Sequence, residues 1–126
     1  MLALSIVSPW GDKIVDQTKQ LEIRSWHPDK LPMLNVALVQ NNIRLNTPGQ
    51  EDPAGQVVAI IDITNCRPWV KEDCARSGCD ETAFEPGWLA WEISNIRKLT
   101  KPVKAVAKRK FYELSAEETA AIVEQL

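Results

Sequence analysis

The residues with the clearest chemical potential are Lys19, Glu22 and Arg24, three ionisable side chains close together in the sequence. They lie in a segment where Leu21 and Ile23 alternate with polar residues, which is the period of a strand that buries one face. Glu22 and Arg24 are two positions apart, so both project from the face opposite to those apolar residues. Lys19 has the other parity, but at the strand entrance its amine can turn to either face. A carboxylate between two cations indicates either a surface ladder of ion pairs or a polar binding site.

The length and composition predict a single domain over residues 1–126, with room for a hydrophobic core. No run of about 18 apolar residues is present, which excludes a transmembrane helix. The beginning of the chain lacks a basic region followed by a long apolar stretch, so we expect a cytoplasmic protein. Three cysteines and one histidine match no zinc spacing, and we therefore expect neither a metal site nor a cofactor.

Charge is distributed unevenly along the chain. The net charge is −2, which argues against a surface coated with positive charge. Residues 97–110, however, contain seven cations and no acid. Five of these cations are candidates for contacting nucleic-acid phosphates, namely Lys101, Lys104, Lys108, Arg109 and Lys110. Alternatively, the lysines protect an exposed sheet edge from pairing with another chain.

Apolar periodicity predicts five or six short strands, within residues 2–7, 19–26, 33–39, 56–64, 88–93 and 106–114. Residues 40–55 and 95–103 are predicted to be loops because they are polar or interrupted by proline. Asp62 lies within the most apolar strand and is expected to be either a structural anchor or part of a pocket wall. Trp88 and Trp91 have opposite parity in one strand, so at least one of them contacts something other than the main core.

Two helices are predicted from their start signals. Ser8 and Pro9 fit an N-cap and a first helical position, and this helix is expected to end near residues 17–18. Ser115 and Glu118 form a capping box before an amphipathic helix over residues 116–126. The predicted fold class is α+β, a small mixed β-barrel with a helix after the first strand and a C-terminal helix.

Several of these motifs together resemble those of a known family. The residues that carry the resemblance are Leu4-Ser5-Ile6, Pro9-Trp10, Lys19, Glu22, Arg24 and Ser25-Trp26. Their order resembles the ASCH family, which has a PUA-like β-barrel with a cleft implicated in RNA or nucleotide binding. The family signature is commonly written Gly-x-Lys-x-x-Glu-x-Arg, and Gln17 stands here in place of the glycine. The resemblance spans nearly the whole chain.

The resemblance implies a cleft beside the second strand, lined by Lys19, Glu22 and Arg24. Further ligand-binding residues that it implies are Ser5, Pro9, Trp10, Trp26 and Trp91. Lys19 or Arg24 can bind a phosphate, and Arg24 can do so with two parallel hydrogen bonds. Glu22 can accept a hydrogen bond from an exocyclic amine or a ribose hydroxyl, and a tryptophan face can stack on a base.

Three functions follow as hypotheses. The first is a non-catalytic module that binds RNA or a nucleotide as a monomer. The second is a metal-independent hydrolase with Lys19 and Glu22 as catalytic residues, acting on RNA or, like an N4-acetylcytidine amidohydrolase, on a modified nucleoside. Amidohydrolase-type members have a lysine at the position of Lys19 together with a threonine and a distant glutamate, but here the threonine position carries Glu22. The distant glutamate is left open among Glu72, Glu81 and Glu85. The third hypothesis is a protein-interaction adaptor that uses the acidic C-terminal helix.

Overall fold

Six strands form one mixed sheet, in the order β2-β5-β4-β3-β1-β6, in the computed structural model, which describes residues 1–126. The strands are β1 (Leu2–Val7), β2 (Leu21–Arg24), β3 (Met33–Asn41), β4 (Asp52–Pro68), β5 (Leu89–Ala107) and β6 (Phe111–Glu113). The α-helices are α1 (Trp10–Val15), α2 (Cys74–Ser77) and α3 (Ala116–Val123), and 3-10 turns occupy Lys71–Asp73 and Glu81–Ala83. β1 is parallel to β3, and every other strand pair is antiparallel.

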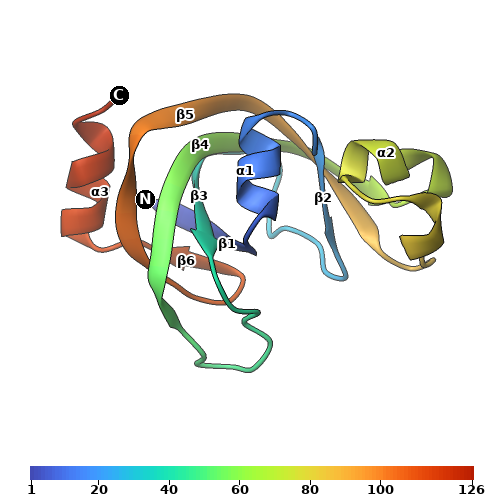
Figure 1. Ribbon diagram of the computed structural model, residues 1–126, viewed down its shortest axis with the longest axis horizontal. Helices are drawn as coiled ribbons and strands as arrows, with labels where there is room; N and C mark the ends of the chain where they lie inside the picture. Colours follow the sequence, from blue (N-terminus) through green and yellow to red (C-terminus); the bar gives the residue numbers. More distant parts are fainter.

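The sheet is not closed into a barrel. β2 and β6 are its two end strands and do not pair with each other. β4 and β5 curve as an arch around α1 in Figure 1. The α+β class was therefore predicted correctly, whereas the expected closure was wrong. Both end strands are only a few residues long, so few unpaired backbone groups are exposed and closure is not needed to protect them.

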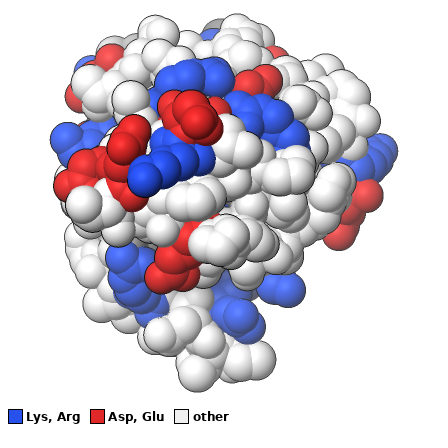
Figure 2. All heavy atoms as spheres, turned by 90° about the vertical axis from the view of Figure 1, so that its right-hand side faces the viewer, with Lys and Arg blue, Asp and Glu red and all other residues white.

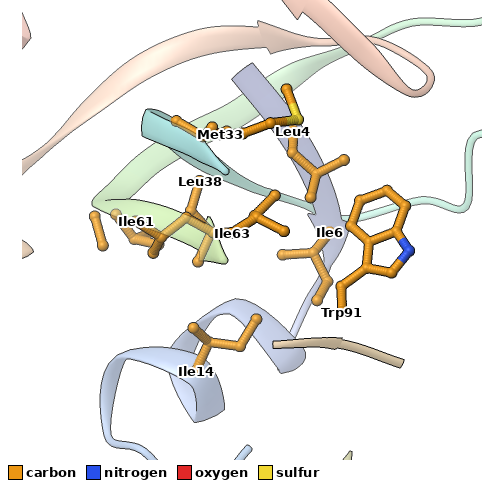
Figure 3. Close-up of a cluster of buried hydrophobic side chains, with 11 residues drawn as sticks. Leu4, Ile6, Ile14, Met33, Leu38, Ile61, Ile63 and Trp91 are labelled. Atoms are coloured by element: carbon orange, nitrogen blue, oxygen red, sulfur yellow. The ribbon is translucent and has the colours of Figure 1, made fainter. Parts of the chain in front are cut away.

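Both faces of the sheet are covered by apolar side chains. On one face, Ile14 of α1 packs with Leu4, Ile6 and Trp91 in a cluster of eleven buried residues, most of which are labelled in Figure 3. On the other face, Ile122 of α3 packs in a second cluster of ten buried residues. Burying each large aliphatic side chain contributes about 1.5–3 kcal/mol, so these two clusters hold α1 and α3 on the sheet.

Strand β5 runs through the segment that was expected to be a loop. Val103 pairs with Val57 and Lys98 pairs with Ala59, so residues 99–102 lie opposite a single residue of β4. Pro102 falls within this bulge, where the strand does not need its missing N–H group. The strand predicted over residues 106–114 is interrupted instead, because β5 ends at Ala107 and β6 begins at Phe111. The polar loop predicted over residues 40–55 is shorter, since only residues 42–51 lie between β3 and β4.

The helix ends agree only in part with their sequence signals. Pro9, not Ser8, is the N-cap of α1, and no side chain caps this helix. The capping box of α3 is present: Glu118 N donates to Ser115 Oγ over 3.1 Å, and Ser115 N donates to Glu118 Oε1 over 2.8 Å. None of the helices has the length and hydropathy needed to cross a bilayer.

Asp62 is a structural anchor and does not line the cleft described below. Its carboxylate accepts hydrogen bonds from Asn35 N (3.0 Å), Asn95 Nδ2 (3.0 Å) and Arg97 Nη2 (2.7 Å). Burial alone would raise the pKa of Asp62, but these hydrogen bonds and the Arg97 charge outweigh burial and lower it. The carboxylate therefore fastens β3, β4 and β5 to one another.

Candidate functional site

A cleft of about 420 Å³ opens between β2, one end strand of the curved sheet, and residues 5–7 of β1, which extend past the short strand β6 and pair with β3 only. We call this gap between β2 and β1 the seam. One wall comes from β1 and the other from β2 with the residues that precede it. The remaining lining comes from Trp10 of α1, from Asn41 at the end of β3 and residues 43–46 after it, from residues 108–110 before β6, and from positions within segment 69–88.

The alternation predicted for β2 positions the polar side chains of the cleft. Leu21 is buried with Trp69 and Cys74, and Ile23 packs against the same cluster. Because successive side chains of a strand point to opposite faces, Glu22 and Arg24 are directed away from this cluster and line the cleft. The sequence thus determined correctly which face each of these side chains takes.

Glu22 is buried between the two cations. Its Oε1 atom lies 3.9 Å from Lys19 Nζ and accepts a 3.0 Å hydrogen bond from Ile23 N. Its Oε2 atom lies 3.6 Å from Arg24 Nη2 but accepts no hydrogen bond. It is the only buried side-chain nitrogen or oxygen of the protein without a hydrogen-bond partner. Leaving a charged acceptor in this state is costly, so Oε2 is suited to a hydrogen-bond donor supplied by a ligand.

Lys19 is as buried as Glu22 and is held from several sides. Its Nζ atom donates a 2.7 Å hydrogen bond to the carbonyl oxygen of Ser77 and lies 5.8 Å from the centre of the Trp10 ring. Burial lowers the pKa of the Lys19 ammonium, and the nearby Glu22 charge opposes this effect. The amine is therefore fixed within the protein rather than free to follow a ligand.

Ser77, whose carbonyl accepts the hydrogen bond from Lys19, is itself held in place by its side chain. Ser77 Oγ donates to Asp73 O over 2.8 Å and accepts from Trp69 Nε1 over 3.1 Å. Asp73 in turn forms a two-pronged ion pair with Arg67, with distances of 2.7 and 2.9 Å. The Arg67 guanidinium lowers the pKa of the Asp73 carboxyl. This chain of contacts keeps α2 against the cleft.

Arg24 crosses the seam. Its Nη2 atom donates a 2.8 Å hydrogen bond to the backbone carbonyl of Ser5 on β1. Ser5 Oγ is also hydrogen-bonded to the hydroxyl of Tyr112 on β6, over 2.7 Å. Burial raises the pKa of the Tyr112 hydroxyl, so this group remains protonated well into the alkaline range.

The cleft concentrates positive charge although the whole chain carries a net charge of −2. Glu22 is its only carboxylate. Six cations line it, namely Lys19, Arg24, Arg44, Lys108, Arg109 and Lys110. The α2 end of the molecule differs, because acidic and basic side chains lie next to each other there in Figure 2. The ion pairs Arg67–Asp73 and Arg76–Glu92 account for this mixture. The unbalanced charge of the cleft therefore favours an anionic ligand.

The structure brings together most, but not all, of the residues singled out in the sequence. Those that line the cleft are Ser5, Trp10, Lys19, Glu22, Arg24, Lys108, Arg109 and Lys110. Lys101 and Lys104 are exposed on β5 outside the cleft, and Pro9 is exposed beside it.

Two of the tryptophans expected at the ligand belong to the core instead. Trp91 is fully buried and stacks on Phe111, with ring centres 5.7 Å apart. Trp26 packs edge-on against both rings, at 4.8 Å from Trp91 and 5.6 Å from Phe111. Neither ring lines the cleft, because together they fill the interior under β6.

Sequence reasoning missed the lining residues that come from the end of β3, from the loop after it and from segment 69–88. These are Asn41, Ile43, Arg44, Leu45, Asn46, Trp69, Ser77, Cys79, Ala83 and Trp88. They share no spacing with the charged triad, and only the folded sheet brings them to the seam. The one available signal was the presence of bulky apolar residues in segments that otherwise looked polar.

The fold of this chain is similar to that of a protein whose crystal structures have been solved. The chain superposes on the crystal structure of ASCH from Zymomonas mobilis with a TM-score of 0.66 and 14% identity, covering 98% of this chain and 93% of that one. A Tyr-to-Phe variant and a Ser-to-Ala variant of the same protein each give a TM-score of 0.63, also at 14% identity. These matches cover 98% of this chain and 96% and 94% of the two variants. At this identity the likeness concerns the fold alone.

A family model extends the likeness from fold to sequence. The model of the ASCH domain matches residues 4–103, which include both walls of the seam. The chain therefore belongs to the ASCH domain family, a family generally related to RNA binding. Comparison with curated proteins gave no match.

Proposed function

We propose that the cleft binds a nucleotide unit, either free or as part of an RNA strand. The observation that carries this proposal is the free Oε2 atom of Glu22, the only carboxylate in a cleft lined by six cations. A ligand that suits this arrangement is anionic overall and also offers a hydrogen-bond donor. A nucleotide has both properties, because its phosphate is negative and its ribose hydroxyls and base amines are donors.

The two inner cations, Lys19 and Arg24, make different contacts and therefore have different roles. Lys19 already donates to the Ser77 carbonyl and lies at 3.9 Å from Glu22, so its charge mainly balances the buried carboxylate. Arg24 is the more exposed of the two, with 23% of its side chain accessible, and only its Nη2 atom is engaged. The remaining guanidinium N–H groups of Arg24 are available for a phosphate oxygen.

The outer cations extend the positive wall toward solvent. Arg44 comes from the loop after β3, and residues 108–110 come from the turn before β6. Contacts between these side chains and phosphates would add affinity that falls as salt concentration rises. A free nucleotide contacts the cations at one end of this wall, whereas an RNA strand extends along the whole wall.

A second candidate function is metal-independent hydrolysis of RNA or of a modified nucleoside. The lowered pKa of Lys19 favours it, because this ammonium gives up a proton more readily than that of an ordinary lysine. In this reaction Glu22 would accept a proton from the attacking water through Oε2, and the Lys19 ammonium would donate a proton to the leaving group as its bond to the substrate breaks. Binding is the stronger proposal, since Lys19 Nζ is committed to a carbonyl oxygen in this structure.

The test is calorimetric titration of the protein with the four nucleoside monophosphates and with a single-stranded RNA of about ten nucleotides. We expect Glu22→Gln, which keeps the shape and removes the charge, to weaken binding at least about tenfold. The matched control is Glu124→Gln, which changes an exposed carboxylate at the C-cap of α3, outside the cleft.

The outcomes separate the hypotheses. Binding of the monophosphates and the RNA alike supports a nucleotide site, and binding of the RNA alone supports a strand site. Mass spectrometry of the recovered ligands, including N4-acetylcytidine, detects product if the protein is a hydrolase. Absence of binding to every ligand at low salt would overturn the proposal and leave the protein-interaction adaptor.

A further inference from the structure

Trp88 is the one tryptophan that the fold leaves without a packing role. The other four are buried in, or packed against, the apolar clusters, namely Trp10, Trp26, Trp69 and Trp91. Trp88 belongs to none of these clusters and forms no pair with another aromatic ring. It is nevertheless one of the lining residues of the cleft, with 38% of its surface exposed. A large aromatic ring at a cleft, unused by the core, is available to a ligand.

The backbone of Trp88 is fixed, although 38% of the residue's surface remains exposed. The Trp88 carbonyl accepts a 2.9 Å hydrogen bond from the backbone N–H of Trp69, a buried residue. Trp88 also directly precedes β5, where Leu89 pairs with Arg24 of β2. The ring therefore starts from an anchored position beside the strand that carries the charged triad. Ordering such a side chain costs little entropy, because only two torsion angles have to be fixed.

We propose that the base of the bound nucleotide stacks on the Trp88 indole. This inference rests on the proposed function and adds to it the residue that recognises the base. In this arrangement the phosphate lies toward Arg24 and the outer cations, and Glu22 Oε2 accepts from the ribose or the base. Stacking on a π-face tolerates any base, so Trp88 provides affinity rather than sequence preference.

The charge of the cleft favours a nucleotide over an apolar partner for this ring. A protein-binding patch would surround Trp88 with further exposed apolar residues. The cleft instead contains six cations, and only one other large apolar residue with substantial exposure, Ile43, lines it. An aromatic ring beside cations is the combination by which proteins bind single-stranded nucleic acid.

The test measures how two ligands bind to the wild-type protein and to two variants of Trp88. AMP is compared with ribose 5-phosphate, which has the same sugar and phosphate but lacks the base. Trp88→Ala is expected to raise the Kd for AMP about 5- to 150-fold, the range that corresponds to loss of one base stack. The Kd for ribose 5-phosphate should not change. Trp88→Phe keeps a ring and should bind AMP within about fivefold of the wild type.

A spectroscopic signature separates stacking from a structural role. AMP should quench part of the tryptophan fluorescence of the wild-type protein, and this part should be absent in Trp88→Phe although binding persists. The matched control is Val70→Ala, which shortens a residue of similar exposure in the same segment that does not line the cleft. It should leave both affinities and the quenching unchanged.

Specific results would overturn the inference. If Trp88→Ala binds AMP as tightly as the wild type does, the proposed function stands and the stacking role falls. If Trp88→Ala weakens AMP and ribose 5-phosphate equally, Trp88 shapes the cleft without contacting the base. If the wild-type protein binds neither AMP nor the RNA of about ten nucleotides, the proposed function and this inference fail together.

Discussion

Arg24 on β2 donates a 2.8 Å hydrogen bond to the backbone carbonyl of Ser5 on β1, although these two strands do not pair. The contact crosses the seam, so a side chain connects β2 to β1 where no backbone ladder does. The same Nη2 atom lies 3.6 Å from Glu22 Oε2. One guanidinium therefore serves both the integrity of the fold and the charge of the cleft.

Arg24→Lys should lower the free energy of unfolding by about 1–3 kcal/mol, because an ammonium cannot reproduce the planar donor set that reaches both Ser5 and Glu22. Urea denaturation measures this change. The matched control is Arg76→Lys, since Arg76 pairs with Glu92 at a more exposed site and its loss should cost no more than about 0.5 kcal/mol. Equal losses in the two variants would contradict a special role for the Arg24 contact.

Arg109→Ala should weaken RNA binding, whereas Lys101→Ala should not. Arg109 lines the cleft, but Lys101 lies outside it on β5. Each lost phosphate contact should also reduce the slope of log K against log salt by about 0.7 for a single strand. Titrations at several salt concentrations check both effects. A larger loss for Lys101→Ala would show that RNA follows the outer face of β5.

Stability should depend on pH through Lys19. Burial lowers the folded-state pKa of Lys19 below its ordinary value of 10.5, so between these two values the unfolded chain binds more protons than the folded one. Stability therefore rises with pH across this window. We expect the free energy of unfolding of the wild type to rise relative to that of Lys19→Met as pH increases toward 10.5. Urea denaturation of both proteins over this range measures the difference. A difference that is flat, or that shrinks with pH, would contradict the prediction.

Gln17→Gly should raise the free energy of unfolding by roughly 0.5–1 kcal/mol. Gln17 has φ 66°, in the left-handed region, and occupies the position where the family signature has glycine. A glycine removes the steric strain of the side chain, although it makes the unfolded chain more flexible. Gln17→Ala keeps the strained Cβ and serves as the control in thermal denaturation. A gain for alanine as large as that for glycine would exclude relief of backbone strain as the cause.

Local patterns predicted the parts of the site that depend on neighbours in sequence. The alternation around Glu22 and Arg24 placed both on one face, and the capping box of Ser115 and Glu118 placed the start of α3. The opposite parity of Trp88 and Trp91 indicated that one of them leaves the core, and the structure shows that it is Trp88. These features follow from the strand period of two and from helix capping, so one sequence was sufficient.

Contacts between distant segments could not be predicted in this way. Arg44 and Ser77 reach the seam because β3 and β4 set the position of one segment and the Arg67–Asp73 ion pair holds the other. Likewise, Pro102 signalled a loop because proline opposes strand pairing, but the bulge in β5 removes the need for its N–H group. Such outcomes depend on strand register, which local composition does not encode.

Many residues that line the cleft, among them Arg44, Trp88 and Arg109, lie outside the strands of the sheet. Substitutions that refit the cleft to a different ligand therefore do not have to shift the register of any strand. Ligand choice and sheet stability can therefore be altered at different positions of this chain. Arg24 differs from these residues, because a single substitution there is expected to change both properties at once.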